Sequence, residues 1–187
     1  MKIVVETPRL ILREIMPDDA EGMFELDSDP EVHRYLGNKP VATIEQSKII
    51  IDNIRKQYLD YGIGRWAVMD KNTQAFMGWS GLKFVTDRTN GHQNFYDVGY
   101  RILRRYWGQG IATESAIASL AYAFNNLDLQ EVFASASIDN AASNRILQKL
   151  GLRFIETYDY QQQIPCIWYS IKKADYKPIH YIHFPKM

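Results

Sequence analysis

The sequence predicts an α/β fold whose mixed, largely antiparallel sheet has about seven strands and carries helices on both faces. Three observations support this prediction. Short runs with strand-like composition recur along the chain, segments with helical apolar periodicity lie between them, and several runs are joined by short polar turns. Serial βαβ units of a parallel sheet are missing. The predicted order is β-α-α-α-β-β-β-α-β-α-β-β, and 187 residues favour one domain.

The first strand and two short helices are predicted near the N-terminus. Residues 9–15 (RLILREI) alternate charged and apolar side chains, as a half-buried strand does. Residues 17–19 (Pro-Asp-Asp) open a helix that runs to about Leu26, with acids in the turn where the helix dipole favours them. Asp29 is the predicted cap of the next helix, whose first residue is Pro30.

A longer helix begins at Thr43. Gln46, three residues on, completes a capping-box pattern. Gly62 and Gly64 are expected to end this helix. Its apolar side chains recur at spacings of three, four and seven: Ile44, Ile51, Ile54, Tyr58 and Tyr61.

The rest of the chain predicts strands and two more helices. A hairpin of residues 65–70 and 75–86 flanks the turn KNTQ, and a polar loop, 87–94, leads to a strand at 95–103. A helix over about 110–124 carries Ile117, Leu120, Ala121 and Phe124 on one face. A strand at 131–137 precedes a helix from Asn140 to Gly151. Residues 153–160 and 166–173 form the last hairpin. We expect a single domain, 1–187, with its core at about 8–173 and an irregular tail at 174–187.

Composition excludes several classes of protein. Lys and Arg total 22 and so do Asp and Glu, so no basic excess is available for binding nucleic acid. The single Cys166 excludes an internal disulfide, fits a reducing compartment, and is interpreted as a packing residue. No signal-peptide pattern and no apolar run of about 18 residues is found. We expect a cytoplasmic protein with no nucleic-acid or membrane partner.

The segment RRYWGQGIATES, residues 104–115, places a Gly-x-Gly pair between a predicted strand and a predicted helix. A helix N-terminus presents unpaired N–H groups and a partial positive charge, and glycine lets phosphate oxygens approach the main chain. Arg104 and Arg105 add positive charge. The segment therefore predicts a phosphate-binding turn; the alternative is a glycine pair that only permits a tight turn.

Two common phosphate-binding motifs do not fit this segment. The P-loop pattern is missing, and Thr113 stands where the dinucleotide fingerprint requires its third glycine. GIGRWA, residues 62–67, follows a helix and precedes a strand, which is the wrong context for that fingerprint.

Arg105-x-x-Gly108-x-Gly110 is similar to the acyl-CoA signature [RQ]-x-x-G-x-[GA] of the Gcn5-related N-acetyltransferases (GNAT). Longer segments, in the same order, resemble the ribosomal-protein N-terminal acetyltransferase branch (the RimJ/RimL-like group). This resemblance spans about Pro8 to Lys172. The segments are TPRLILREIMPDDAEGMFEL, DPEVHRYL, DVGYRILRRYWGQGIATES and NAASNRILQKLGLRF.

The resemblance implies acetyl-CoA as acetyl donor, bound where the fourth and fifth strands split apart. Tyr100 and Ile102 would present backbone groups to the pantetheine arm. Asn140 stands where the family has an asparagine that reaches the pantetheine, and it is an equally good helix cap. Ser143 matches the N-x-x-S of this branch and either touches the coenzyme or serves the helix. The implied diphosphate cradle is Arg105, Trp107, Gly108, Gln109, Gly110 and Ala112.

The resemblance also implies direct attack of an amine on the acetyl thioester. Asp97 stands where family members carry a glutamate and is the candidate base; being one methylene shorter, it would act through a bridging water. The alternative is an ordinary surface ion pair with Arg101 on the same strand face. Many relatives place a tyrosine seven residues after the asparagine, but this chain has Leu147, so the general acid is unassigned.

The acceptor pocket is expected between the early helices and the last hairpin. Tyr35, Trp79, Tyr96 and Trp168 are its candidate lining residues, with core packing as the alternative for each. His180 and His183 form H-x-x-H without a Cys or carboxylate at metal spacing, so no metal site is expected.

The sequence is compatible with three functions. The first is an acetyl-CoA-dependent N-acetyltransferase of a protein N-terminal amine. The second acetylates a small amine such as an antibiotic, polyamine or amino acid derivative. The third is a CoA-binding sensor without turnover, which Leu147 and the Glu-to-Asp change at Asp97 keep open. The protein is expected to be a monomer or a homodimer.

Overall fold

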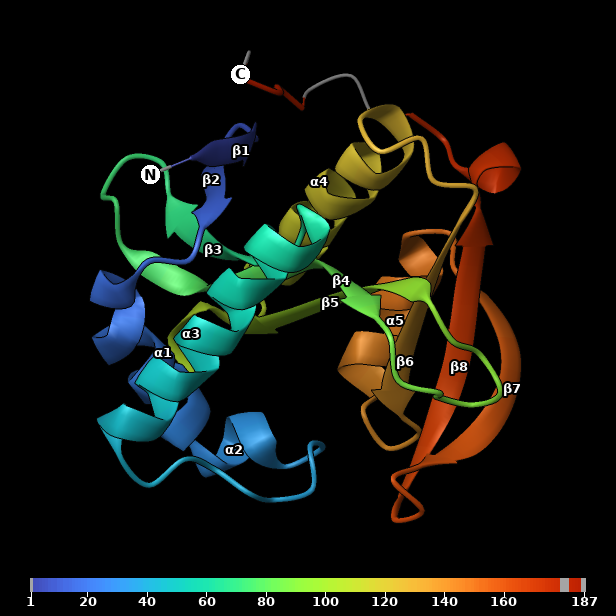
Figure 1. Cartoon of the computed structure of the whole chain (residues 1–187), viewed down its shortest axis with the longest axis horizontal. Coiled ribbons are helices and arrows are strands. Elements are labelled where there is room, and N and C mark those ends of the chain that lie inside the picture. The colour runs from blue at the N-terminus through green and yellow to red at the C-terminus, as the bar shows by residue number, and fades with distance from the viewer. Residues whose placement is uncertain (1, 179–181, 186–187) are drawn as a thin grey trace.

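The computed structural model describes residues 2–178 and 182–185. Its centre is an eight-stranded sheet in the order β1-β2-β3-β4-β5-β6-β8-β7 (Figure 1). Every neighbouring pair is antiparallel except β5 and β6. The strands are β1 (Ile3–Glu6), β2 (Leu10–Glu14), β3 (Arg65–Asp70), β4 (Phe76–Val85), β5 (Phe95–Ile102), β6 (Glu131–Ser137), β7 (Arg153–Tyr160) and β8 (Ile164–Lys172).

Helices occupy the predicted places between these strands. The α-helices are α1 (Ala20–Ser28), α2 (Pro30–His33), α3 (Ile44–Tyr61), α4 (Ile111–Asn125) and α5 (Ala141–Lys149). There are also three short 3₁₀ turns among the described residues. The first, η1 (Pro17–Asp19), precedes α1, and the second, η2 (Arg104–Tyr106), precedes the glycine turn. The third, η3 (Lys173–Asp175), follows β8. The predicted α/β class with a largely antiparallel sheet is confirmed.

Two parts of the fold differ from the prediction. The sheet has eight strands because Ile3–Glu6 pairs antiparallel with β2, and four residues are too few for alternation to reveal a strand. The tail after residue 173 is not wholly irregular: the N–H of His183 donates to the Glu6 carbonyl over 2.9 Å, and the Glu6 N–H donates back over 2.8 Å. Residues 179–181, which include His180, lie outside the described part of the chain.

The predicted helix caps are present. The Asp29 carboxylate accepts the Glu31 N–H at 2.9 Å. Thr43 and Gln46 form the capping box, and the Gln46 side chain also accepts the N–H of Ala42 at 2.6 Å. Gly62 ends α3 in the left-handed conformation, at a φ of +67°, which glycine adopts without a steric penalty. Local sequence therefore sets where these helices begin and end.

The two faces of the sheet carry different helices. On one face Arg101 of β5 reaches Asp27 of α1, with Nη1 2.5 Å from Oδ1. On the other face Ser80 of β4 lies 3.3 Å, oxygen to oxygen, from Ser119 of α4. Because neighbouring residues of a strand point to opposite faces, we call these the α1 face and the α4 face. The β4–β5 register is unbroken from Gly78↔Ile102 to Val85↔Phe95, so the assignment holds along both strands.

The sheet splits between β5 and β6. Within the described residues these parallel strands pair only at Asp97↔Phe133, whereas β6 pairs with β8 along seven residues. Figure 1 shows β6, β8 and β7 running steeply across the direction of β4 and β5. The part of β5 beyond Asp97 therefore has a free backbone edge toward β6. That edge leads directly to the turn before α4.

In residues 2–178 and 182–185, none of the helices is both long enough and apolar enough to cross a membrane.

Candidate active site and coenzyme loop

The glycine turn between β5 and α4 is built from two residues in the left-handed region. Gly108 has a φ of +74° and Gly110, the N-cap of α4, a φ of +79°. Both values favour glycine. Within the described chain, the N–H groups of residues 108–111 donate to no acceptor. An open hollow lies beside them, lined by Pro8, Gly110, Thr113, Glu114 and Ile117. The loop thus presents free donors at a helix N-terminus, an arrangement that can bind the oxygens of an anion.

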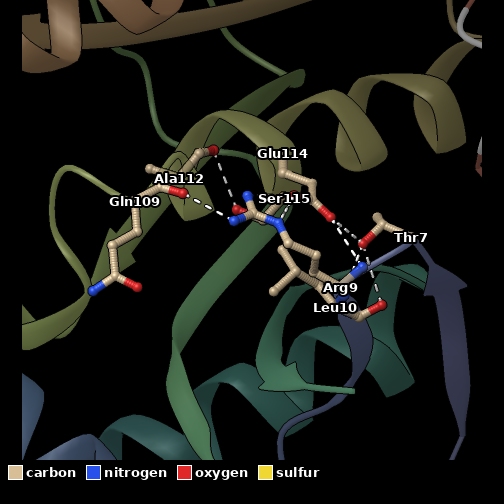
Figure 2. Close-up of polar contacts among 7 residues, drawn as sticks. All are labelled: Thr7, Arg9, Leu10, Gln109, Ala112, Glu114 and Ser115. Atoms are coloured by element: carbon tan, nitrogen blue, oxygen red, sulfur yellow. Dashed lines mark hydrogen bonds and ion pairs between the residues drawn. The ribbon is translucent and has the colours of Figure 1, made fainter. Parts of the chain in front are cut away.

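Arg9, the residue before β2, fixes the orientation of this loop (Figure 2). Its Nη1 donates to the Gln109 carbonyl at 3.0 Å, and its Nε donates to Glu114 of α4 at 2.7 Å. Thr7 donates to the same carboxylate at 2.6 Å. In a trans peptide the C=O and the next N–H point in opposite directions. Because Arg9 holds the carbonyl of Gln109, it also fixes the direction of the Gly110 N–H.

The other residues of the predicted cradle have partners within the chain. Arg105 is paired with Glu25 of α1, and its guanidinium lies 4.9 Å from the ring centre of Tyr106. Trp107 is 47% exposed, and its indole N–H donates to the Ile102 carbonyl at 2.7 Å. Ala112 lies in the first turn of α4, and its carbonyl accepts the Ser115 hydroxyl at 3.2 Å. The Ile102 carbonyl therefore accepts a hydrogen bond from the indole of Trp107, which lies beside the glycine turn.

Tyr100, Ser143 and Asn140 lie together where the split opens on the α4 face. The Tyr100 hydroxyl lies 3.0 Å from Ser143 Oγ and donates to the Ser143 carbonyl at 3.2 Å. Burial raises the pKa of Tyr100 to about 12. Asn140 caps α5, since its Oδ1 accepts the Ser143 N–H at 3.1 Å. The predicted cap is thus present, and Ser143 links α5 to β5.

Asp97 lies at the point where the two strands part, on the α1 face. Arg65 of β3 pairs with its carboxylate and donates to its main-chain carbonyl at 2.8 Å. The Asp97 side chain is only 21% exposed. Burial raises its pKa, and Arg65 opposes that rise through its charge and its hydrogen bond. A carboxylate with a raised pKa, placed where the two strands part, is suited to proton transfer.

The expected alternative pairing of Asp97 with Arg101 is wrong. The two side chains do share a face, but residues four apart on a strand lie about 13 Å apart at 3.3 Å per residue. Arg101 instead pairs with Asp27 at 2.5 Å, and Asp97 pairs with Arg65.

The structure does not bring the four acceptor-pocket candidates together. Trp79 faces α1 and lies between two guanidinium groups, 5.3 Å from Arg65 and 5.2 Å from Arg101. Tyr96 points to the α4 face, opposite Phe84. Tyr35 follows α2, under the guanidinium of its neighbour Arg34.

Trp168 is only 1% exposed. Its ring packs against Phe95 and Phe133, and His92 of the β4–β5 loop stacks on it with ring centres 5.6 Å apart.

Two features bear on the remaining chemistry. Leu147, which replaces the family tyrosine, is buried in the main core. Among the described residues, no three His, Cys, Asp or Glu side chains gather as metal ligands do.

A split sheet with a glycine turn at the head of the following helix is the architecture of an acetyltransferase. The model of the acetyltransferase (GNAT) domain matches residues 9–153. The chain belongs to this family and is an N-acetyltransferase, and enzymes of the family use acetyl-CoA.

Individual relatives agree with this assignment. The chain is 33% identical over 165 residues to the uncharacterized N-acetyltransferase YoaA of Bacillus subtilis, covering 87% of this chain and 91% of that protein. The ribosomal-protein-S5-alanine acetyltransferase of Vibrio fischeri has the same fold, with a TM-score of 0.74, 19% identity, and coverage of 95% of this chain and 100% of that one. The spermidine N-acetyltransferase of Vibrio cholerae, solved with CoA and spermine, gives a TM-score of 0.72, 16% identity, and coverage of 89% and 97%.

Proposed function

We propose that the protein transfers acetyl from acetyl-CoA to the N-terminal α-amine of a protein, with Asp97 as base. The observation that carries the coenzyme part is the set of free N–H groups at residues 108–111, beside the free edge of β5. Arg105, Trp107, Gly108, Gln109, Gly110 and Ala112 would hold the diphosphate, and Tyr100, Ile102, Asn140 and Ser143 would line the pantetheine path. The bound coenzyme supplies the activated acetyl group.

The rest of the reaction is assigned to the chain's own groups. The acceptor amine must lose a proton before it attacks, and Asp97, directly or through a water, would take that proton. A backbone N–H on the free edge of β5 would stabilise the developing oxyanion. An α-amine with a pKa near 7.7–8.0 needs less help from a single carboxylate than a lysine-type amine near 10.4. This chemistry favours an N-terminal acceptor.

A small amine is the second candidate, because the similar fold from Vibrio cholerae is that of a spermidine N-acetyltransferase. Release of CoA thiol should be followed with three acceptor sets: peptides with free N-termini, the same peptides blocked at the N-terminus but carrying lysine, and polyamines. We expect turnover with free N-termini only. Turnover confined to polyamines would favour the small-amine function. Coenzyme binding without turnover across the panel would favour a sensor.

Arg9→Ala is expected to weaken acetyl-CoA binding about threefold to tenfold, because a charge-assisted hydrogen bond of about 1 kcal/mol no longer fixes the Gln109–Gly110 peptide. Titration of coenzyme binding by calorimetry measures the effect. Arg153→Ala is the matched control, because it removes another exposed arginine, the one on β7 that pairs with Asp175 at 2.9 Å. Equal affinity in the Arg9 variant and the wild type would contradict a positioning role.

A further inference from the structure

The strands around Asp97 leave a slot that is filled by one side chain. Gly81 of β4 and Gly99 of β5 are register partners on the α1 face, and Arg65 is the register partner of Gly81 on the other side. The Arg65 guanidinium lies over Gly99: a Cβ added there would be 2.8 Å from Nη2 and 3.1 Å from Cζ. A glycine inside a strand indicates close approach of another group, and here that group is a guanidinium.

From this slot Arg65 reaches three acceptors. Its Nη1 donates to the carbonyls of Gly81 and Asp97, and its Nη2 donates to Asp97 Oδ2. Trp79 lies against it with 5.3 Å between Cζ and the ring centre. The Arg65 side chain is 12% exposed. A guanidinium held this way has little freedom to leave, so the carboxylate it contacts has a fixed direction.

We infer that Arg65 is a positioning residue for the reaction: it fixes the Asp97 carboxylate at the split and sets the pH at which that carboxylate can accept a proton. The inference rests on the proposed function of Asp97 as base. Gly99 is required for this arrangement, because a side chain at position 99 would occupy the space of the Arg65 guanidinium.

Other charged or titratable groups approach Asp97 from the neighbouring elements. Lys83 is its register partner on β4, and Tyr158 of β7 interacts with its charge. His92, from the β4–β5 loop, contacts the ring of Phe133. Phe133 lies on β6 and is the strand-pairing partner of Asp97. Arg65 is the group that bonds directly to the carboxylate, and both its charge and its hydrogen bond hold the pKa of Asp97 down against burial. Its removal must therefore raise that pKa.

The test measures kcat/KM between pH 5 and pH 9 with one peptide acceptor, for Arg65→Gln, Arg65→Lys and Gly99→Ala. A base must be deprotonated to act, so a raised pKa moves the acid limb to higher pH. Each pH unit of movement costs about tenfold in rate below the limb. We expect Arg65→Gln and Gly99→Ala to move the limb upward while the alkaline plateau is kept, and Arg65→Lys to move it less.

Gly99→Ala keeps the test decisive if Arg65→Gln does not fold. The alanine methyl group would lie 2.8 Å from Nη2 and 3.1 Å from Cζ, so it displaces the guanidinium while both charged residues remain. Arg153→Gln, which removes an exposed ion pair with Asp175 at 2.9 Å, is the matched control and should leave the limb in place. Because every variant meets the same acceptor, a shift reports on the enzyme.

A fall in rate that is equal at every pH would overturn the inference, since a purely structural role lowers the amount of active enzyme without moving the limb. If Asp97→Asn moves the acid limb up toward the pKa of the acceptor amine but the Arg65 and Gly99 variants leave it in place, the inference alone fails. If Asp97→Asn leaves the limb unchanged, the assignment of the base itself fails.

Discussion

Asp97→Asn is expected to lower kcat/KM by about 10²–10⁴-fold, the usual contribution of a general base. Asparagine keeps the size of the side chain but cannot take a proton. The loss should be greatest at low pH, where the acceptor arrives as an ammonium, and smaller above the pKa of the acceptor amine, where neutral amine is already present. Steady-state rates against pH, with acetyl-CoA saturating, measure this dependence.

Asp128→Asn is the control for this variant, because Asp128 is an exposed partner of Lys173. It should retain the wild-type profile. An Asp97→Asn enzyme with an unchanged pH–rate profile would remove Asp97 from the mechanism and leave deprotonation of the acceptor to solvent.

Gly110→Val is expected to raise the KM for acetyl-CoA by at least about tenfold, with a much smaller effect on the KM for the amine. A β-branched residue at a φ of +79° costs about 1–2 kcal/mol or more, so the turn relaxes and its N–H groups lose their common direction. A loss of 1.4 kcal/mol is about tenfold in affinity. Initial rates at varied acetyl-CoA concentration measure the change.

Gly151→Val is a closely matched control. Gly151 has a φ of +87°, and an added Cβ would lie 3.4 Å from its nearest neighbour, as it would at Gly110. It ends α5, far along the helix from Asn140. Both variants should lose similar stability, whereas only Gly110→Val should change the coenzyme KM. A rise in KM for both would mean that strain anywhere in the fold disturbs the site.

The elements that sequence predicts well are those whose signals are local. Asn140 predicts the N-terminal cap of α5, and Gly62 predicts the end of α3. The Gly108–Gly110 pair predicts the N-terminus of α4. Each depends on residues within one turn of the chain. β1 fails this criterion, because its four residues are identified only by their pairing with β2.

The parts of the site that sequence does not predict depend on register between distant strands. Arg65 and Asp97 are 32 residues apart, and only the pairing of β3, β4 and β5 brings them together. Arg9 and Gln109 are separated by 100 residues. The sequence does carry one local signal of the contact between Arg65 and Asp97. The glycine inside the strand segment DVGY indicates that another group approaches the backbone there. The second pair left no such signal.

Among the described residues, the two arms of the sheet share a single ladder rung, Asp97 with Phe133. The main chain at that rung is bonded to both arms, whereas β5 beyond it is bonded to β4 alone. A change in the angle between the arms would therefore displace the Asp97 carboxylate less than the residues at the end of β5.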